Sequence, residues 1–132
     1  MILQILTKYD RLYLYNLGGE SMKKTYNKLV RDNIPEIIRL DNKKCQTRIL
    51  NDKDYILELK KKLCEKANEV NLATNRQEII EEISDVIEII EALKDVYSID
   101  SKDIENARIQ KANKNGKFEK KIFLEYVEEK YE

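Results

Sequence analysis

The sequence predicts an all-α protein: an antiparallel helical hairpin with two shorter helices, which completes a four-helix core as a dimer. The first observation is composition, since 38% of the 132 residues are charged and only three Gly and one Pro occur. Helices tolerate Lys and Glu, whereas turns need Gly and Pro. The second is the recurrence of apolar residues at helical spacing in two long segments. The third is the presence of capping residues at the ends of these segments.

The length corresponds to one domain, which we place at residues 22–132 after an extension at residues 1–21. The extension has no sustained apolar period and ends on Gly18, Gly19, Glu20 and Ser21, before a second methionine, Met22. Gly-Gly-Glu is what a purine-rich ribosome-binding site would encode. We expect either that the extension is not native or is disordered, or that it forms a short strand or arm on the domain. Mass spectrometry of the protein made from its own gene separates these expectations.

The first predicted helix is short: it follows Asp32 as its N-cap and ends near Asp41 and Asn42. Asp32 is a good N-cap, and Pro35 falls in the first turn, where its missing N–H group is tolerated. A polar stretch then leads to Asn51 and Asp52, which are suited to cap the next helix.

Two long helices are expected at about residues 53–73 and 77–97. The apolar stripe of the first consists of Ile56, Leu59, Leu63, Ala67 and Val70. The stripe of the second consists of Ile79, Ile80, Ile83, Val86, Ile87, Ile90 and Leu93, with Ile89 well to one side. Because the loop between them is short, we expect an antiparallel hairpin.

The fourth predicted helix covers about residues 102–114. Ser98, Asp100 and Ser101 are its cap candidates, and Gly116 is expected to form a left-handed C-cap. The tail, residues 118–127, mixes apolar and charged residues. It would form a short strand or an extended arm over the hairpin.

The apolar arc of the 77–97 helix is wider than one partner helix covers. Counting Ile89, it spans roughly half the circumference, against about 100° for a single packed face. Two hairpins that pair across a twofold axis would cover this arc. We therefore expect a homodimer or a higher homo-oligomer. The alternative is that the tail and the short helix cover the arc within one chain.

Composition excludes several classes of protein. Lys plus Arg and Asp plus Glu each number 25, and this balance argues against binding to a nucleic acid polymer or a membrane surface. Histidine is absent, which removes Ser-His-Asp catalysis and His-ligated zinc. No apolar run approaches the roughly 18 residues of a membrane span. The two cysteines form no CxxC motif, and we expect them to be reduced thiols. We therefore expect a cytoplasmic protein.

The 77–97 helix carries an unusual acidic face. It holds six acids and no Lys or Arg between Gln77 and Leu93. Like charges three and four residues apart repel one another, by about 1–2 kcal/mol in sum. We expect either a metal ion or basic side chains from a neighbouring segment to compensate. The six acids are Glu78, Glu81, Glu82, Asp85, Glu88 and Glu91.

Two pairs of carboxylates are placed to converge at the edge of the helix interface. Glu65 and Glu69 share one face of the first long helix, and Glu82 and Asp85 project close together from the second. Four converging carboxylates would suit Mg²⁺ or Mn²⁺. The alternative is a solvated acidic surface.

The sequence resembles the MazG-like and phosphoribosyl-ATP pyrophosphohydrolase-like group of all-α nucleoside triphosphate pyrophosphohydrolases. The most specific match is YNKLVRDNIP at residues 26–35. KLCEKANE at residues 62–69 is similar to a segment with the family pattern EExxE, and EEISD at residues 81–85 matches ExxD. GKFEKKIFL at residues 116–124 resembles the family's GGFEKRIFL. The resemblance covers about residues 26–129.

The resemblance implies Mg²⁺-dependent hydrolysis of a nucleotide between its α and β phosphates, which gives a nucleoside monophosphate and pyrophosphate. It implies that Glu69, Glu82 and Asp85 hold Mg²⁺ (or Mn²⁺) and that Glu65 is a fourth carboxylate or a proton acceptor. Basic side chains would stabilise the phosphate charges. The candidates for substrate binding are Lys28, Arg31 and Lys111.

Two departures from the family pattern leave other functions open. Lys66 stands at the second Glu of EExxE, a position that the family uses for metal, and residues 115–117 read Asn-Gly-Lys in place of Arg-Gly-Gly. A second interpretation is therefore a catalytically silent relative that binds nucleotide or a protein partner. In that case Lys66 would form a salt bridge with Glu82 or Asp85. A third interpretation is a plain helical interaction protein.

Overall fold

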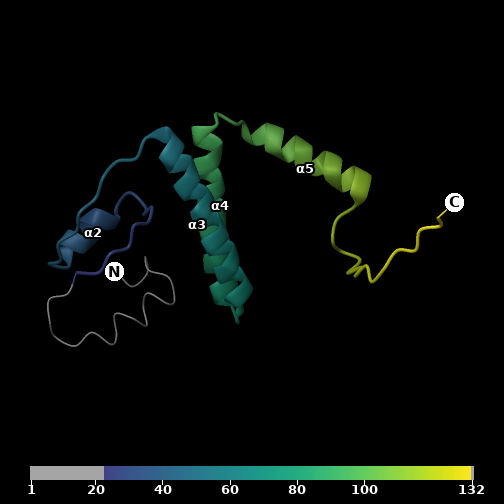
Figure 1. Cartoon of the computed structure of the whole chain (residues 1–132), viewed down its shortest axis with the longest axis horizontal. Helices are drawn as coiled ribbons and strands as arrows, with labels where there is room; N and C mark the ends of the chain where they lie inside the picture. The colour runs from purple at the N-terminus through teal and green to yellow at the C-terminus, as the bar shows by residue number, and fades with distance from the viewer. Residues whose placement is uncertain (1–22, 132) are drawn as a thin grey trace. The chain divides into compact units, whose positions relative to one another are not determined.

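The structure is a computed structural model that describes residues 23–131. Its helices are α2 (Ile34–Leu40), α3 (Asp52–Leu72), α4 (Arg76–Val96) and α5 (Ser101–Asn115) (Figure 1). No strand occurs among these described residues, so the all-α prediction is confirmed. The expectations for residues 1–21 lie outside the described range. The chain divides at residue 96 into two compact units, of which the first holds α2 to α4 and the second α5 and the tail.

Helix α2 begins one residue later than predicted. Its N-cap is Asn33, not Asp32, and the Asn33 side chain makes no capping hydrogen bond because its backbone is already helical, with φ −87° and ψ −3°. Pro35 lies in the first turn as predicted. Since Pro is tolerated throughout a first turn, it did not distinguish the two registers. Ile34 is the buried residue of this short helix, at 5% exposure.

Helices α3 and α4 pack against each other and are joined by residues 73–75 (Figure 1). Their bounds lie within one residue of the predicted ones. The Asn51 side chain caps α3 by accepting a hydrogen bond from the backbone N–H of Asp54 at 2.8 Å. At the start of α4, Asn75 accepts from the N–H of Glu78 at 2.9 Å, and Glu78 accepts from the N–H of Thr74 at 2.9 Å. These two bonds fix the turn and resemble a capping box, except that Glu78 accepts from the N–H of Thr74 and not from that of Asn75.

The face of α4 that packs on α3 is not centred on the predicted stripe. Ile89, which we placed to one side, is the buried residue of α4, at 7% exposure. Four members of the stripe are instead exposed by 38–53%. The expected width of the apolar arc is thus present, but α3 covers only one edge of it. The exposed members are Ile80, Ile83, Ile87 and Ile90.

In the second unit, α5 is capped by Asp100, whose side chain accepts from the backbone N–H of Lys102 at 2.9 Å. Gly116 ends the helix with φ +82°, a positive value as predicted, but with ψ −178°. This is an extended conformation that is essentially restricted to glycine, not the expected left-handed helical one. The tail forms no strand within its described residues, and Phe118 and Phe123 are 97% and 88% exposed. None of the described helices has the length and apolar character needed to cross a membrane.

Candidate functional site

Three acidic side chains converge between α3 and α4. Glu69 comes from α3, and Glu82 and Asp85 come from α4 at i, i+3 spacing. One carboxylate oxygen of each lies within 4.8 Å of the others. These are the three residues that we predicted as metal ligands, and the structure brings them together.

An ammonium group lies within this acidic cluster (Glu69, Glu82 and Asp85). Lys66 Nζ donates a hydrogen bond to Glu69 Oε2 at 3.1 Å and lies 3.3 Å from Asp85 Oδ2. The Lys66 side chain is only 13% exposed. Burial acts to lower the pKa of Lys66, but the hydrogen bond to Glu69 and the attraction of Glu69 and Asp85 outweigh it, so the pKa is raised. Lys66 therefore stays charged at neutral pH.

A second cation reaches the cluster from the segment before α2. Arg31 Nη2 donates to Asp85 Oδ1 at 2.8 Å, so each oxygen of Asp85 faces a different cation. The sequence predicted compensation of the acidic face by a metal ion or by neighbouring basic side chains. The basic side chains, Arg31 and Lys66, are present.

Glu82 is the least compensated acid of the cluster. Burial, a hydrogen bond with Glu69 and the negative charge of Glu69 raise its pKa to about 7, while Lys66 opposes the shift. The hydrogen bond between Glu82 and Glu69 needs a proton on one of the two carboxyls. With both charged, Glu69 Oε1 and Glu82 Oε2 are buried and have no hydrogen-bond partner within the described part of the chain. Buried polar atoms without a partner are costly, so a proton or a cation at these two oxygens would be stabilising.

As arranged, the cluster does not fit a divalent cation. Carboxylates are the ligands that Mg²⁺ prefers, but the Lys66 ammonium already contacts two of the three. Two like unit charges 4 Å apart repel by about 4 kcal/mol at an effective dielectric constant of 20. A divalent ion beside Lys66 would meet roughly twice that repulsion. Metal binding would require Lys66 to leave the cluster.

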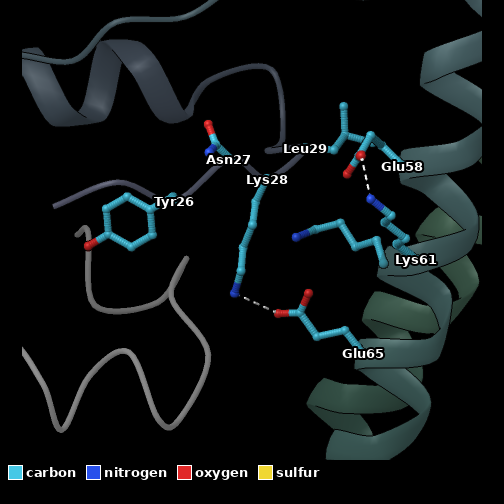
Figure 2. A pocket seen from close by; sticks show the side chains of 8 residues that line it. Tyr26, Asn27, Lys28, Leu29, Glu58, Lys61 and Glu65 are labelled. Carbon is cyan, nitrogen blue, oxygen red and sulfur yellow. Dashed lines mark hydrogen bonds and ion pairs between the residues drawn. The ribbon is translucent and has the colours of Figure 1, made fainter.

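A pocket of about 210 Å³ lies between the segment 26–29 and α3 (Figure 2). Lys28 extends from the segment toward α3, where its Nζ donates to Glu65 Oε1 at 3.2 Å. Lys61 donates to Glu58 Oε1 at 3.1 Å on the same wall. Glu65, predicted as a fourth carboxylate of the metal site or as a proton acceptor, pairs with Lys28 at this pocket and is not a member of the acidic cluster. The residues that line the pocket are Tyr26, Asn27, Lys28, Leu29, Glu58, Lys61, Lys62 and Glu65.

The predicted substrate-binding residues fall in different places. Lys28 lines the pocket and Arg31 reaches the acidic cluster. Lys111 is exposed on α5, in the second unit, and its role stays a prediction. Sequence reasoning missed Lys61 and Lys62. Their position one turn before Glu65 and Lys66 on α3 was the available signal, since residues three and four apart share a helix face.

No match to this chain is found among protein families, characterised proteins or solved structures. The resemblance to the MazG-like group therefore rests on the motifs at residues 26–35, 62–69, 81–85 and 116–124.

Proposed function

We propose that the chain is a catalytically silent relative of the MazG-like pyrophosphohydrolases, which binds nucleotide without hydrolysing it. One observation carries this proposal: the Lys66 ammonium lies 3.1 Å from Glu69 Oε2 and 3.3 Å from Asp85 Oδ2. Lys66 stands where the resemblance implies a metal-binding Glu. It gives the cluster a fixed internal cation, and the ion pair with Asp85 is one of the two that the silent interpretation predicted.

The cations at the edge of the site are available for phosphate. The Lys28–Glu65 and Arg31–Asp85 pairs are partly exposed, with Lys28 and Arg31 side chains 35% and 57% exposed. Exposed ion pairs of this kind contribute about 0–1 kcal/mol. Phosphate is a more highly charged acceptor than a carboxylate, so it can replace the carboxylate at little cost. This supports nucleotide binding through its phosphates.

The second candidate function is the Mg²⁺-dependent hydrolysis that the resemblance implies, to a nucleoside monophosphate and pyrophosphate. The convergence of three carboxylate oxygens within 4.8 Å favours it. So do the two buried oxygens without a partner, on Glu69 and Glu82. It requires that Lys66 be displaced when the metal binds.

Pyrophosphate release from a panel of NTPs and dNTPs, with Mg²⁺ or Mn²⁺, separates the two functions. We expect no release from any substrate by the wild-type chain. Release that is lost in Glu69→Gln and Asp85→Asn would overturn the silent assignment and establish the enzyme. Binding of the same nucleotides is measured in parallel by calorimetry, and failure of all of them to bind would leave a helical interaction protein.

We also propose that α4 forms a homodimer through its exposed isoleucines. Ile80, Ile83, Ile87 and Ile90 follow a 3-4-3 spacing, which is that of a coiled-coil seam, and lie within about 80° of arc at 100° per residue. A second copy of the hairpin of α3 and α4 would complete a four-helix core. Sedimentation analysis should give a dimer for the wild type and a monomer for Ile83→Lys/Ile87→Lys. A wild-type monomer would contradict the dimer.

A further inference from the structure

Lys62 is a half-buried cation that has no partner among the described residues. It lines the pocket between the segment 26–29 and α3. Its neighbours Lys28 and Lys61 are ion-paired with Glu65 and Glu58, at 3.2 and 3.1 Å. Lys62 makes no hydrogen bond or ion pair with any residue that the structure describes. A half-buried charge of this kind is unfavourable unless something pairs with it.

The surroundings of Lys62 favour an anion. Burial lowers the pKa of Lys62, and the positive charges of Lys66 and Lys28 lower it further, against the attraction of Glu65. Three lysines face two glutamates in the pocket, and both glutamates already have lysine partners. The uncompensated charge is therefore positive and is centred on Lys62. An anion in the pocket would relieve both the repulsion and the cost of burial.

The size of the pocket restricts the kind of anion. Its volume of about 210 Å³ equals that of about seven water molecules at about 30 Å³ each. Sites for whole drug-sized ligands usually exceed about 300 Å³. The pocket therefore suits a short phosphate chain and is too small for a complete nucleotide. Lysine binds phosphate as a point charge and needs no fixed orientation. Tyr26 lines the same pocket, on the side of the segment 26–29 (Figure 2).

We infer that this pocket binds a di- or triphosphate chain, with Lys62 as its principal ligand and with Lys28 and Lys61 released from their glutamates to assist. The inference deepens the proposed function and rests on it for the identity of the chain as that of a nucleotide. It requires no metal ion, because the lysines supply the compensating charge.

The test is calorimetric titration of the full chain with inorganic tripolyphosphate and, separately, with ATP, in the absence of divalent metal. Lys62→Met keeps the apolar stem of the side chain and removes the charge. Lys53→Met is the matched control, since Lys53 is an exposed lysine of the same helix outside the pocket. We expect one tripolyphosphate site per chain, weakened about tenfold by Lys62→Met and less than twofold by Lys53→Met.

Absence of tripolyphosphate binding, or equal weakening by both variants, would overturn the inference. The two proposals fail in different ways. If ATP binds and Lys62→Met leaves its affinity unchanged, nucleotide binding stands and the pocket is not its site. If tripolyphosphate binds through Lys62 but no nucleotide binds more tightly than tripolyphosphate, the pocket stands and its assignment to nucleotide is wrong.

Discussion

Lys62 and Lys66 lie one turn apart on α3, and both are partly buried, yet their environments differ in kind. Lys66 contacts two carboxylates at 3.1 and 3.3 Å, and its pKa is raised. Lys62 contacts none among the described residues, and its pKa is lowered by burial. Burial acts to lower the pKa of both lysines. The carboxylate partners of a lysine, and not its burial, therefore decide whether its charge is neutralised within the fold or can bind a ligand.

The same contrast applies to the acids that face these lysines. Glu69 and Asp85 are held by Lys66 and belong to the packed interface of α3 and α4. Glu65 pairs with Lys28 at a pocket, where its side chain is 27% exposed. On our proposal, the acidic cluster is a structural ion-pair network and the pocket is the ligand site. Stability should depend on the first and ligand binding on the second.

The largest expected effect is on stability. Lys66→Met should lower the free energy of unfolding by about 2–4 kcal/mol, because it leaves the partly buried Glu69 without its cation and Asp85 with Arg31 alone. Lys62→Met should change it by less than about 0.5 kcal/mol, because Lys62 pairs with no residue in the described part of the chain. Urea unfolding at pH 7 measures both. Equal destabilisation by the two variants would abolish the distinction between the two lysines.

The second effect is on the pH dependence of stability. The pKa of Glu82 is about 7 in the folded chain, above the ordinary value of 4.5. Between these values the folded chain binds more protons than the unfolded one, so stability falls as pH rises. We expect a loss of about 1–2 kcal/mol from pH 5 to pH 8, since solvent reduces the full effect of the shift.

Glu82→Gln is the control for this pH dependence. It removes the titrating group and should flatten the decrease, measured as the urea midpoint at each pH. Stability that rises from pH 5 to pH 8 in the wild type, or a decrease that Glu82→Gln leaves intact, would show that Glu82 is not held in its neutral form.

The smallest effect is on chemical reactivity. Because its pKa is lowered, Lys62 should be acetylated severalfold faster by acetic anhydride at pH 8 than Lys66, whose pKa is raised. Peptide mass spectrometry gives the rate at each lysine. Tripolyphosphate should slow the reaction at Lys62 and leave exposed Lys53 unaffected. Equal rates at Lys62 and Lys66 would contradict the assigned difference.

Local sequence signals predicted the bounds of the helices well and the way in which they pack less well. Caps such as Asn51 and Asp100 placed the helix ends within one or two residues, because capping depends on nearby backbone groups alone. The predicted packing face of α4 was wrong at Ile89, which we placed to one side of the stripe and which is buried. The whole arc of α4 is apolar, so periodicity alone could not show which edge α3 covers.

The site was predicted only in part, because helix spacing determines some of its contacts and the position of an irregular segment determines the others. The i, i+3 spacing of Glu82 and Asp85 fixed their common face, and a short loop placed Glu69 opposite them. The pairing of Arg31 with Asp85 and the isolation of Lys62 depend on how residues 26–31 lie against the helices. No periodic pattern encodes the position of an irregular segment.

The most direct test is calorimetric titration of Mg²⁺ into the wild type, Lys66→Glu and the control Lys53→Glu, which makes the same charge change at an exposed position of α3. The wild type and Lys53→Glu should show no Mg²⁺ site. Lys66→Glu should bind one Mg²⁺, with an affinity at least about tenfold above the weakest that the titration detects, because it exchanges the internal cation for a fourth carboxylate. Wild-type binding as tight as that of Lys66→Glu would contradict the conclusion that Lys66 takes the place of the metal.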